Sequence, residues 1–208
     1  MLRVFVDDHG RHGNALGVVI DGPSVPVGER QRLAAELGYS ETVFVDDREH
    51  GVVRIFTPSA ELPFAGHPTV GTAWLLGADV LRPPAGEVRA RREGELTWVV
   101  ARPEWAPEFE FVELGRAADV EAFSSGRGGD PDRVVWAFEE EGAGRVRARV
   151  FAPSLGVPED PATGSACVRL AAGLGRPLTV RQGEGSLIHA RPLADGFVEL
   201  GGRVVEEG

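Results

Sequence analysis

Two short segments of the chain carry residue types from which an anion-binding site can be built, and they nearly repeat one another. Residues 67–73 read His-Pro-Thr-Val-Gly-Thr-Ala, and residues 160–166 read Asp-Pro-Ala-Thr-Gly-Ser-Ala. Each follows a similar apolar stretch, at residues 54–59 and 149–154. Because the copies are too far apart for a solenoid repeat, we interpret them as one duplication that gives two similar lobes with a cleft between them.

Both segments have a proline where a helix is expected to begin. Pro68 and Pro161 suit the first helical position, because proline lacks an N–H and its φ already matches the helix. Asp160 is then the predicted N-cap residue, and His67 holds the equivalent place. The free N–H groups of a first turn carry about half a unit of positive charge, which attracts a carboxylate or a developing oxyanion. We therefore expect two helix N-termini that face one anion.

A glycine and a hydroxyl residue recur in both predicted first turns. Gly71 and Gly164 leave the backbone open to a ligand, and Thr72 and Ser165 place a hydroxyl beside it. Either motif alone is a common capping arrangement with no chemistry attached. Because a fold does not require the same glycine and hydroxyl in both copies, the duplication favours a two-sided pocket.

A further candidate is the carboxylate of Glu41, in the Ser-Glu-Thr-Val-Phe sequence at residues 40–44. In a strand, Glu41 shares a face with Val43 and Val45, and burial of that face would raise the pKa of its carboxyl group and make it a stronger base. The pattern alone favours the alternative, a glutamate at the entrance of a strand that stays in water.

The sequence lacks the residues that several common catalytic mechanisms require. The chain has no lysine, so neither a Schiff base nor a P-loop lysine is available. Cys167 is the only cysteine, and its helical spacing with Leu170 and Leu174 predicts a core position. The five histidines show no metal-ligand spacing, and the glycine-rich residues 126–131 are interpreted as a turn. Carboxylate, imidazole and backbone dipoles remain for catalysis.

Composition and charge narrow the class of partner. The 208 residues are 42% hydrophobic and 26% charged, as in an ordinary globular chain of one large or two small domains. A net charge of −10 argues against binding to nucleic acid or to an anionic membrane surface. No apolar run is long enough to span a bilayer and the start is too polar for a secretory signal, so we expect a cytoplasmic protein. Alternation of Arg145, Arg147 and Arg149 predicts one solvated strand face.

The periodicity of the chain predicts an α+β fold in which strands dominate and each lobe has one principal helix. We place an N-terminal lobe at 1–102 and a C-terminal lobe at 103–208, and allow the last strand to return to the first lobe. The expected helices are 29–37, 68–76 and 161–174. The expected strands are 2–6, 16–20, 39–45, 52–57, 86–90, 96–101, 109–114, 134–139, 146–151, 178–182, 186–190, 196–200 and 203–206.

Taken together, these segments resemble the phenazine-biosynthesis PhzF-like family, whose fold is shared with diaminopimelate epimerase and proline racemase. The matching stretches are 13–19, 40–44, 54–58, 61–73, 149–153 and 159–166, with weaker matches at 182–183 and 191–192. The Glu-Leu-Pro-Phe-Ala-Gly-His-Pro string at 61–68 is highly specific. The resemblance covers most of the first lobe and the second from about Gly142 onward.

The resemblance implies two pseudo-symmetric lobes, each an open barrel-like, mostly antiparallel sheet around a central helix, with the site between the helix N-termini. It also implies that Glu41 moves a proton between carbons of a small carboxylate-bearing substrate, without cofactor or metal. Related proteins are often homodimers. His67 and Asp160 are the other expected catalytic residues. The expected substrate-binding residues are Ser40, Gly66, Gly71, Thr72, Gly164 and Ser165.

The chain also departs from the family pattern. The motif positions hold no thiols, which excludes epimerisation by a pair of cysteines, and residues from about 102 to 133 are shortened and match no family segment clearly. Our leading hypothesis is a cofactor-independent isomerase. The alternatives are a small-molecule binding protein of the same fold without turnover, and a purely structural domain.

Overall fold

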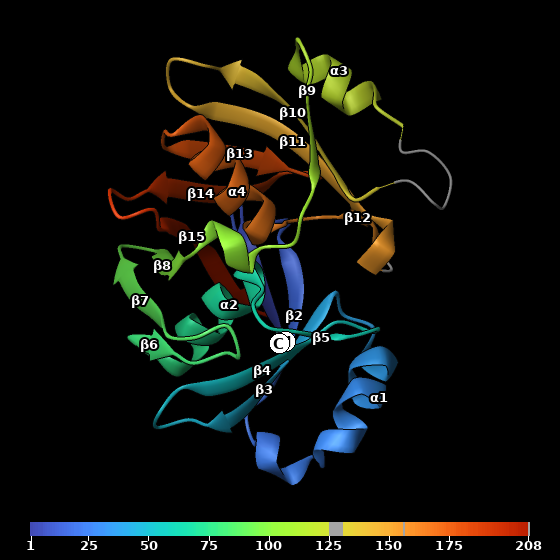
Figure 1. Cartoon of the computed structure of the whole chain (residues 1–208), viewed down its shortest axis with the longest axis vertical. Coiled ribbons are helices and arrows are strands. Elements are labelled where there is room, and N and C mark those ends of the chain that lie inside the picture. The colour runs from blue at the N-terminus through green and yellow to red at the C-terminus, as the bar shows by residue number, and fades with distance from the viewer. Residues whose placement is uncertain (125–130, 156, 208) are drawn as a thin grey trace.

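The structure, a computed structural model, describes residues 1–124, 131–155 and 157–207. These residues form fifteen strands, four α-helices and three short 3-10 helices (Figure 1). The turn predicted at 126–131 lies almost wholly outside them.

The elements follow the chain in two groups. Up to residue 101 they are β1 (Leu2–Val6), β2 (Asn14–Val19), η1 (Gly22–Ser24), α1 (Val27–Leu37), β3 (Glu41–Asp47), β4 (Val52–Phe56), β5 (Glu61–Leu62), α2 (Gly66–Leu76), β6 (Val80–Leu81), β7 (Val88–Glu93) and β8 (Leu96–Ala101). Beyond it they are η2 (Pro103–Trp105), β9 (Glu110–Glu113), α3 (Ala117–Ala122), β10 (Arg133–Glu140), β11 (Arg145–Ala152), η3 (Pro153–Leu155), β12 (Val157–Asp160), α4 (Gly164–Leu174), β13 (Leu178–Gln182), β14 (Ser186–Pro192) and β15 (Val198–Glu206).

The strands form one open sheet in which β15 holds the central place. The order is β5-β4-β3-β2-β1-β15-β14-β13-β11-β10-β9, with β12 beside β11 and with β8, β7 and β6 as a branch from β15. β15 pairs antiparallel with β1 and β8 from the first half of the chain and with β14 from the second. The boundary between residues 102 and 103 remains our proposal for the division into lobes.

Helices α2 and α4 each occupy the centre of one half of the sheet, and they meet in the middle of the molecule (Figure 1). The sequence of α2 has no charged residue, so its first eight residues can all be buried, and the apolar stripe of α4 faces the core. Both helices end at a glycine in the left-handed conformation, Gly77 and Gly175, with φ of 62°. The predicted α+β class, with an open sheet around a central helix in each half, is confirmed. Cys167 is buried, as expected.

The N-terminal ends of α2 and α4 touch through two glycines. A Cβ added to Gly66 would lie 2.9 Å from the Cα of Gly164, and one added to Gly164 would lie 3.1 Å from the Cα of Gly66. Both distances are shorter than ordinary van der Waals contact, so only glycine at both positions permits the approach. The two helix starts therefore converge, as the repeat predicted.

The predicted helix boundaries were wrong at both N-termini. α2 begins at Gly66 after Ala65 as N-cap residue, so Pro68 is its third residue, and His67 its second. α4 begins at Gly164 after Thr163, so Pro161 precedes the helix and Asp160 ends β12. The reason is that none of the first N–H groups of a helix has an intrahelical partner, so proline fits throughout the first turn. Gly66, not Gly71, is the structural counterpart of Gly164.

Two further expectations about strands were also wrong. Arg147 is not solvated: its side chain is 3% exposed, because α3, which the sequence pattern did not predict, packs over β11 and brings Glu121 to it. The two strands expected at 196–200 and 203–206 are the single strand β15. Gly201 and Gly202 lie within it, because Trp98 and Phe5 fill the space that side chains would need there.

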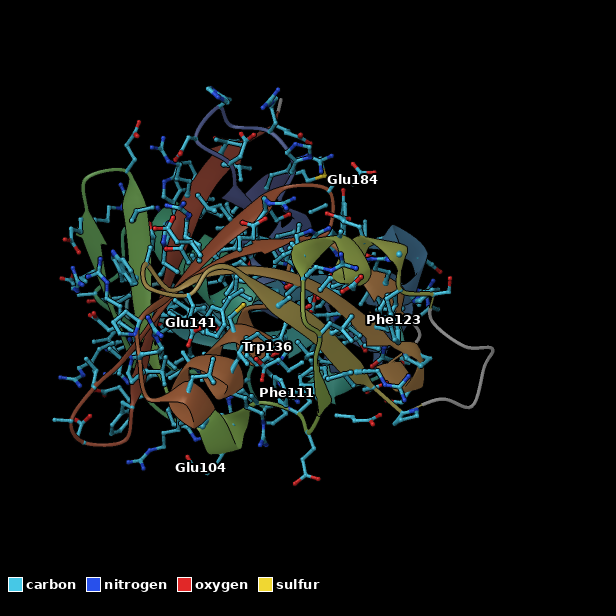
Figure 2. The ribbon with its side chains drawn as sticks, turned by 90° about the horizontal axis from the view of Figure 1, so that it is seen from above. Glu104, Phe111, Phe123, Trp136, Glu141 and Glu184 are labelled. Carbon is cyan, nitrogen blue, oxygen red and sulfur yellow. The ribbon has the colours of Figure 1, made fainter. Side chains whose placement is uncertain are left out.

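The second half of the sheet ends at β9. Phe111 on β9 and Trp136 on the adjacent strand β10 mark this edge (Figure 2). No helix in the described part of the chain is long and apolar enough to cross a membrane.

Candidate active site

Glu41 opens β3 and lies in the interior. Its side chain is 15% exposed, and Val43 and Val45, on the same face of the strand, are fully buried. The expectation that this glutamate stays in water was wrong, because residues of the second half, among them Asp160, cover the start of the strand. Burial raises the pKa of Glu41 to about 7, against a smaller opposing effect of the Ser40 hydroxyl.

His67 lies in the first turn of α2, next to this carboxylate. Its Nδ1 atom is 3.4 Å from Oε2 of Glu41, and its side chain is 3% exposed. Burial lowers the pKa of His67 to about 4, although the charge of Asp160 and the backbone of Ala15 act in the opposite direction. The imidazole is therefore neutral at pH 7, with one ring nitrogen that donates a hydrogen bond and one that accepts.

Asp160, at the end of β12, is the second buried carboxylate. Its Oδ1 accepts a hydrogen bond of 2.7 Å from Nδ2 of Asn14, and its Oδ2 accepts one of 2.5 Å from Oγ1 of Thr163. Burial, and then the charge of Glu41, raise the pKa of Asp160 to about 6, while His67 and the hydrogen bonds lower it. Two carboxylates that repel each other titrate as a coupled pair.

Three polar residues to which the sequence analysis gave no role complete this group. Asn14, Thr163 and Gln182 are all buried, and they link the two halves of the chain through Asp160. Asn14 and Gln182 each stand at one end of a strand, Asn14 as the first residue of β2 and Gln182 as the last of β13. A polar residue at either end of an apolar strand is the sequence signal that could have identified Asn14 and Gln182 as site residues.

The predicted binding residues divide into two sets. Ser40 and Ser165 line one cavity together with Glu41 and Asp160, and Gly66 and Gly164 begin the two helices beside it. Gly71 and Thr72 are elsewhere: both lie inside α2, and a Cβ on Gly71 would strike Leu16 at 2.6 Å and Val4 at 2.7 Å. Gly71 therefore serves the packing of α2 on the sheet.

The cavity has a polar and an apolar wall and is nearly closed, with a volume of about 30 Å³. That space is large enough for ordered water but smaller than a ring-sized molecule. The polar wall comprises Ser40, Glu41, Thr57, Asp160, Thr163 and Ser165, and the apolar wall comprises Leu62, Phe64, Ala65, Pro107, Phe109, Ala152 and Val157.

The segment after β8 supplies part of the apolar wall. The ring of Trp105 packs on Phe64 with centroids 5.6 Å apart, and the guanidinium of Arg169 on α4 donates hydrogen bonds of 3.1 and 2.8 Å to the carbonyl of Ala106. Pro107 and Phe109, which follow this anchored stretch, line the same cavity as Glu41 and Asp160.

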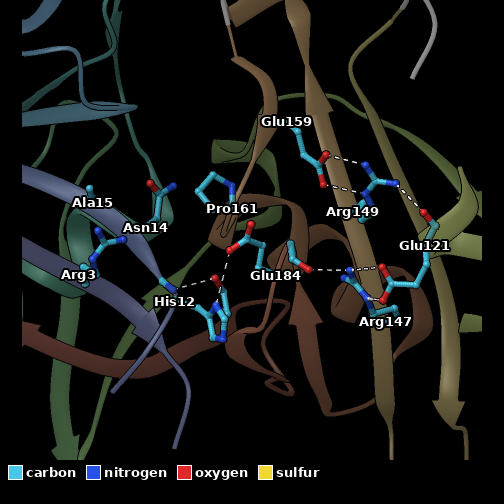
Figure 3. Close-up of a pocket in the computed structure, with 13 residues that line it drawn as sticks. Arg3, His12, Asn14, Ala15, Glu121, Arg147, Arg149, Glu159, Pro161 and Glu184 are labelled. Atoms are coloured by element: carbon cyan, nitrogen blue, oxygen red, sulfur yellow. Dashed lines mark hydrogen bonds and ion pairs between the residues drawn. The ribbon is translucent and has the colours of Figure 1, made fainter. Parts of the chain in front are cut away.

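A larger, open cavity of about 690 Å³ lies between β2 and β11 (Figure 3). Two of its three arginines are paired with carboxylates of the same cavity, Arg147 with Glu121 and Arg149 with Glu159, and the third, Arg3, is paired with Glu207 outside it. The smaller cavity is the better candidate for catalysis, because buried carboxylates with raised pKa values are typical of active sites. Among the described residues, no group of three or more His, Cys, Asp or Glu side chains could hold a metal ion.

Comparison with known proteins shows the family to which the chain belongs. A profile of the family described as phenazine biosynthesis-like protein (PhzC-PhzF) matches residues 2–104 and 129–190. The trans-2,3-dihydro-3-hydroxyanthranilate isomerase of Pseudomonas fluorescens is 33% identical over 223 aligned residues, which cover 82% of this chain and 80% of that protein. The isomerase of the same name from Pseudomonas chlororaphis is 35% identical over 208 residues, 79% of this chain and 75% of that protein.

Solved structures extend the likeness to the whole fold. A PhzF-family phenazine biosynthesis protein from Bacillus anthracis superposes with a TM-score of 0.79 at 17% identity, over 98% of this chain and 94% of that chain. A protein described as a predicted epimerase from Pseudomonas aeruginosa gives 0.75 at 25% identity, over 100% and 95%. The chain therefore belongs to the phenazine biosynthesis-like protein family and, like the curated relatives, is an isomerase.

Proposed function

We propose that Glu41 abstracts a proton from an activated C–H bond of a small cyclic carboxylic acid and returns it at another carbon of the same molecule, without a cofactor. The observation that carries this proposal is the buried Glu41, with a pKa raised to about 7 and His67 at 3.4 Å. A base with a pKa near the working pH is the most effective for proton transfer in both directions. Glu41 can therefore act first as base and then as acid.

The charge that develops on the substrate needs a partner that is not itself a base. The converging N-terminal turns of α2 and α4, which begin at Gly66 and Gly164, offer backbone N–H groups with partial positive charge. Ser165, in the first turn of α4, and Ser40, before β3, add hydroxyl groups on the cavity wall. These groups favour a substrate whose carboxylate delocalises the negative charge formed when the proton leaves.

The apolar wall supports a flat, ring-shaped substrate. Phe64 and Phe109 line the same cavity as the two carboxylates, and aromatic side chains bind planar rings through stacked or edge contacts. The curated relatives are named for an acid of this kind, trans-2,3-dihydro-3-hydroxyanthranilate. We propose a dihydroaromatic acid of that class as the substrate.

The test is exchange of substrate hydrogen with solvent. Trans-2,3-dihydro-3-hydroxyanthranilate incubated with the enzyme in heavy water is expected to isomerise and to gain deuterium, as followed by NMR and mass spectrometry. Glu41→Gln keeps the size of the side chain but removes the base, and both conversion and exchange are expected to fall by at least about 10³-fold. Glu113→Gln, which changes an exposed glutamate on β9, is the matched control. Full exchange by Glu41→Gln would remove Glu41 from this role.

The nearly closed cavity supports one rival, a binding protein of the same fold without turnover. Calorimetry with a panel of cyclic carboxylic acids, followed by analysis of the recovered ligand, separates the two functions. Binding with unchanged ligand and no deuterium uptake favours the rival.

A further inference from the structure

The two buried carboxylates differ in what surrounds them. Both oxygens of Asp160 accept hydrogen bonds, from Asn14 and from Thr163. Oε2 of Glu41, by contrast, is buried and has no hydrogen-bond partner within the described chain. This difference bears on which of the two holds a proton.

On the Thr163 side of Asp160, backbone groups set which atom is the hydrogen-bond donor. A backbone N–H can only donate, and a backbone carbonyl can only accept. The N–H of Thr163 donates to Oε1 of Gln182 at 3.0 Å, and the carbonyl of Asp160 accepts from Nε2 of Gln182 at 2.7 Å. The orientation of the Gln182 amide is therefore settled. Its Nε2 also donates to Oγ1 of Thr163 at 2.9 Å, so the hydroxyl hydrogen of Thr163 is left to donate to Asp160.

The other side of Asp160 is fixed in the same manner. The carbonyl of Ala162 accepts from Nδ2 of Asn14 at 3.3 Å, so the amide nitrogen of Asn14 faces Asp160 and its Oδ1 faces Ser40. Oδ1 can only accept, and the Ser40 hydroxyl donates to it at 2.9 Å. The hydrogen of Ser40 therefore points to Asn14, and the Ser40 hydroxyl lowers the pKa of Glu41 by less than burial raises it.

We propose that Thr163 and Asn14, oriented by Gln182 and Ser40, hold Asp160 as the anion of the carboxylate pair and thereby place the shared proton on Glu41. A proton on either oxygen of Asp160 would set an O–H donor against the donor already there and cost one charge-assisted hydrogen bond, whereas a proton on Oε2 of Glu41 displaces no donor. Thr163 and Gln182 are thus positioning residues, which act through Asp160.

The other titratable groups at the pair leave this partition unchanged. Glu41 faces His67 on α2 and Asp160 on β12, while Asp160 faces Glu41, His67 and Cys167 on α4. Burial lowers the pKa of His67 to about 4 and raises that of Cys167, so both are neutral where the carboxylates titrate. Because both groups are neutral, they add no charge that could reverse the order in which Asp160 and Glu41 lose their protons.

The catalytic meaning rests on the proposed function and deepens it. A proton taken from the substrate by Glu41 would be lost to a neighbour that held it more tightly. Because Asp160 is kept as an anion by its donors, the proton stays on Glu41 until it is returned to the second carbon.

The test follows the two carboxyl groups directly by ¹³C NMR of protein labelled at the side-chain carboxyls of Glu or Asp. Glu41→Gln and Asp160→Asn identify the two signals. In the wild-type protein, at the pH where the pair has lost one of its two protons, Glu41 is expected to be mainly protonated and Asp160 mainly ionised. A proton found on Asp160 at that pH overturns the proposal.

Thr163→Val removes the hydroxyl and keeps the shape of the side chain, and Thr163→Ser restores the hydroxyl. In Thr163→Val the titration midpoint of the Asp160 carboxyl group is expected to rise by about one pH unit, because the anion loses one charge-assisted hydrogen bond. The titration midpoint of Glu41 is expected to move to lower pH. Thr163→Ser is expected to titrate as the wild type does. If Thr163→Val does not fold, Thr163→Ala removes the same group.

The proposal is overturned if the titration midpoint of Glu41 is unchanged in the hydroxyl-free variant. It is also overturned if Thr163→Ser shows the same shift of the midpoints as Thr163→Val. The measurement needs no turnover. Its failure is therefore distinguishable from failure of the isomerase, which the deuterium experiment tests by itself.

Discussion

The carboxylate of Glu41 and the imidazole of His67 lie 3.4 Å apart, and burial has reversed their usual order of pKa values, to about 7 for the acid and about 4 for the imidazole. In water the carboxyl group would ionise first and the imidazole would be the better base. Here the glutamate is the group that changes charge near neutral pH. The first two predictions below follow from this reversal.

Glu41→Gln is expected to be more stable than the wild type at pH 8. The pKa of Glu41 rises on folding from 4.5 to about 7, so the native state binds the proton more tightly, and its stabilising effect is lost as the pH rises through about 7. The gain at pH 8 is about 3 kcal/mol, and it disappears near pH 4.5. Urea unfolding at both pH values measures it, and Glu113→Gln should show no such pH-dependent difference. A variant less stable than the wild type at pH 8 contradicts the burial argument.

The rate of isomerisation is expected to rise with pH and to level off above about pH 7. The base must be ionised to accept the proton, and the pKa of Glu41 is about 7 in the free protein. His67, with a pKa of about 4, adds no inflection between pH 6 and 8. Measurement of kcat/KM from pH 5 to 9 tests this, and a rate that declines between pH 6 and 8 would show that the group titrating there must be protonated, which contradicts Glu41 as the base.

Gly66→Ala and Gly164→Ala are expected to destabilise the protein by about 1–3 kcal/mol each, because each added methyl group presses on backbone atoms of the other helix. Gly173→Ala is the control in the interior of α4, where a Cβ meets nothing within 4 Å. That change should stabilise the protein by about 0.5–1 kcal/mol. Thermal unfolding of the three variants measures both effects. Equal stability of Gly66→Ala and the wild type would mean that the helix starts are farther apart than described.

Phe109→Ala is expected to raise KM for the ring-shaped acid by about 10-fold or more and to leave kcat nearly unchanged. The ring lines the cavity but has no group that can donate or accept a proton, so we expect it to stabilise the ground state and the transition state alike. Phe111→Ala, on the same segment but outside the cavity and 36% exposed, is the control. Steady-state kinetics separates the two parameters, and a fall in kcat alone would assign Phe109 to the chemical step instead.

The sequence was sufficient to predict the fold class, most strands and the meeting of two helix starts beside Asp160 and His67. Alternation and helical spacing are local properties, so β1, β4, β8 and the end of α2 at Leu76 could be predicted from them. The position of each helix start could not, because Pro68 fits several places in a first turn. α3 was missed because its six residues are too short for a helical pattern to emerge.

The environment of Glu41 depends on residues far away in the chain. Its strand pattern fits a solvated side chain equally well, and burial comes from the second half, through Ala152, Val157 and Asp160. The pairing of Gln182 with Thr163 likewise joins the end of β13 to the start of α4. Such side-chain geometry arises only once the sheet has formed.

The central position of β15 has a consequence for how the protein is made. Its partners β1 and β8 are synthesised long before it, yet the edges they offer stay unpaired until residues 198–206 arrive. Exposed strand edges invite aggregation. We therefore expect a nascent chain that stops short of Val198 to depend on chaperones.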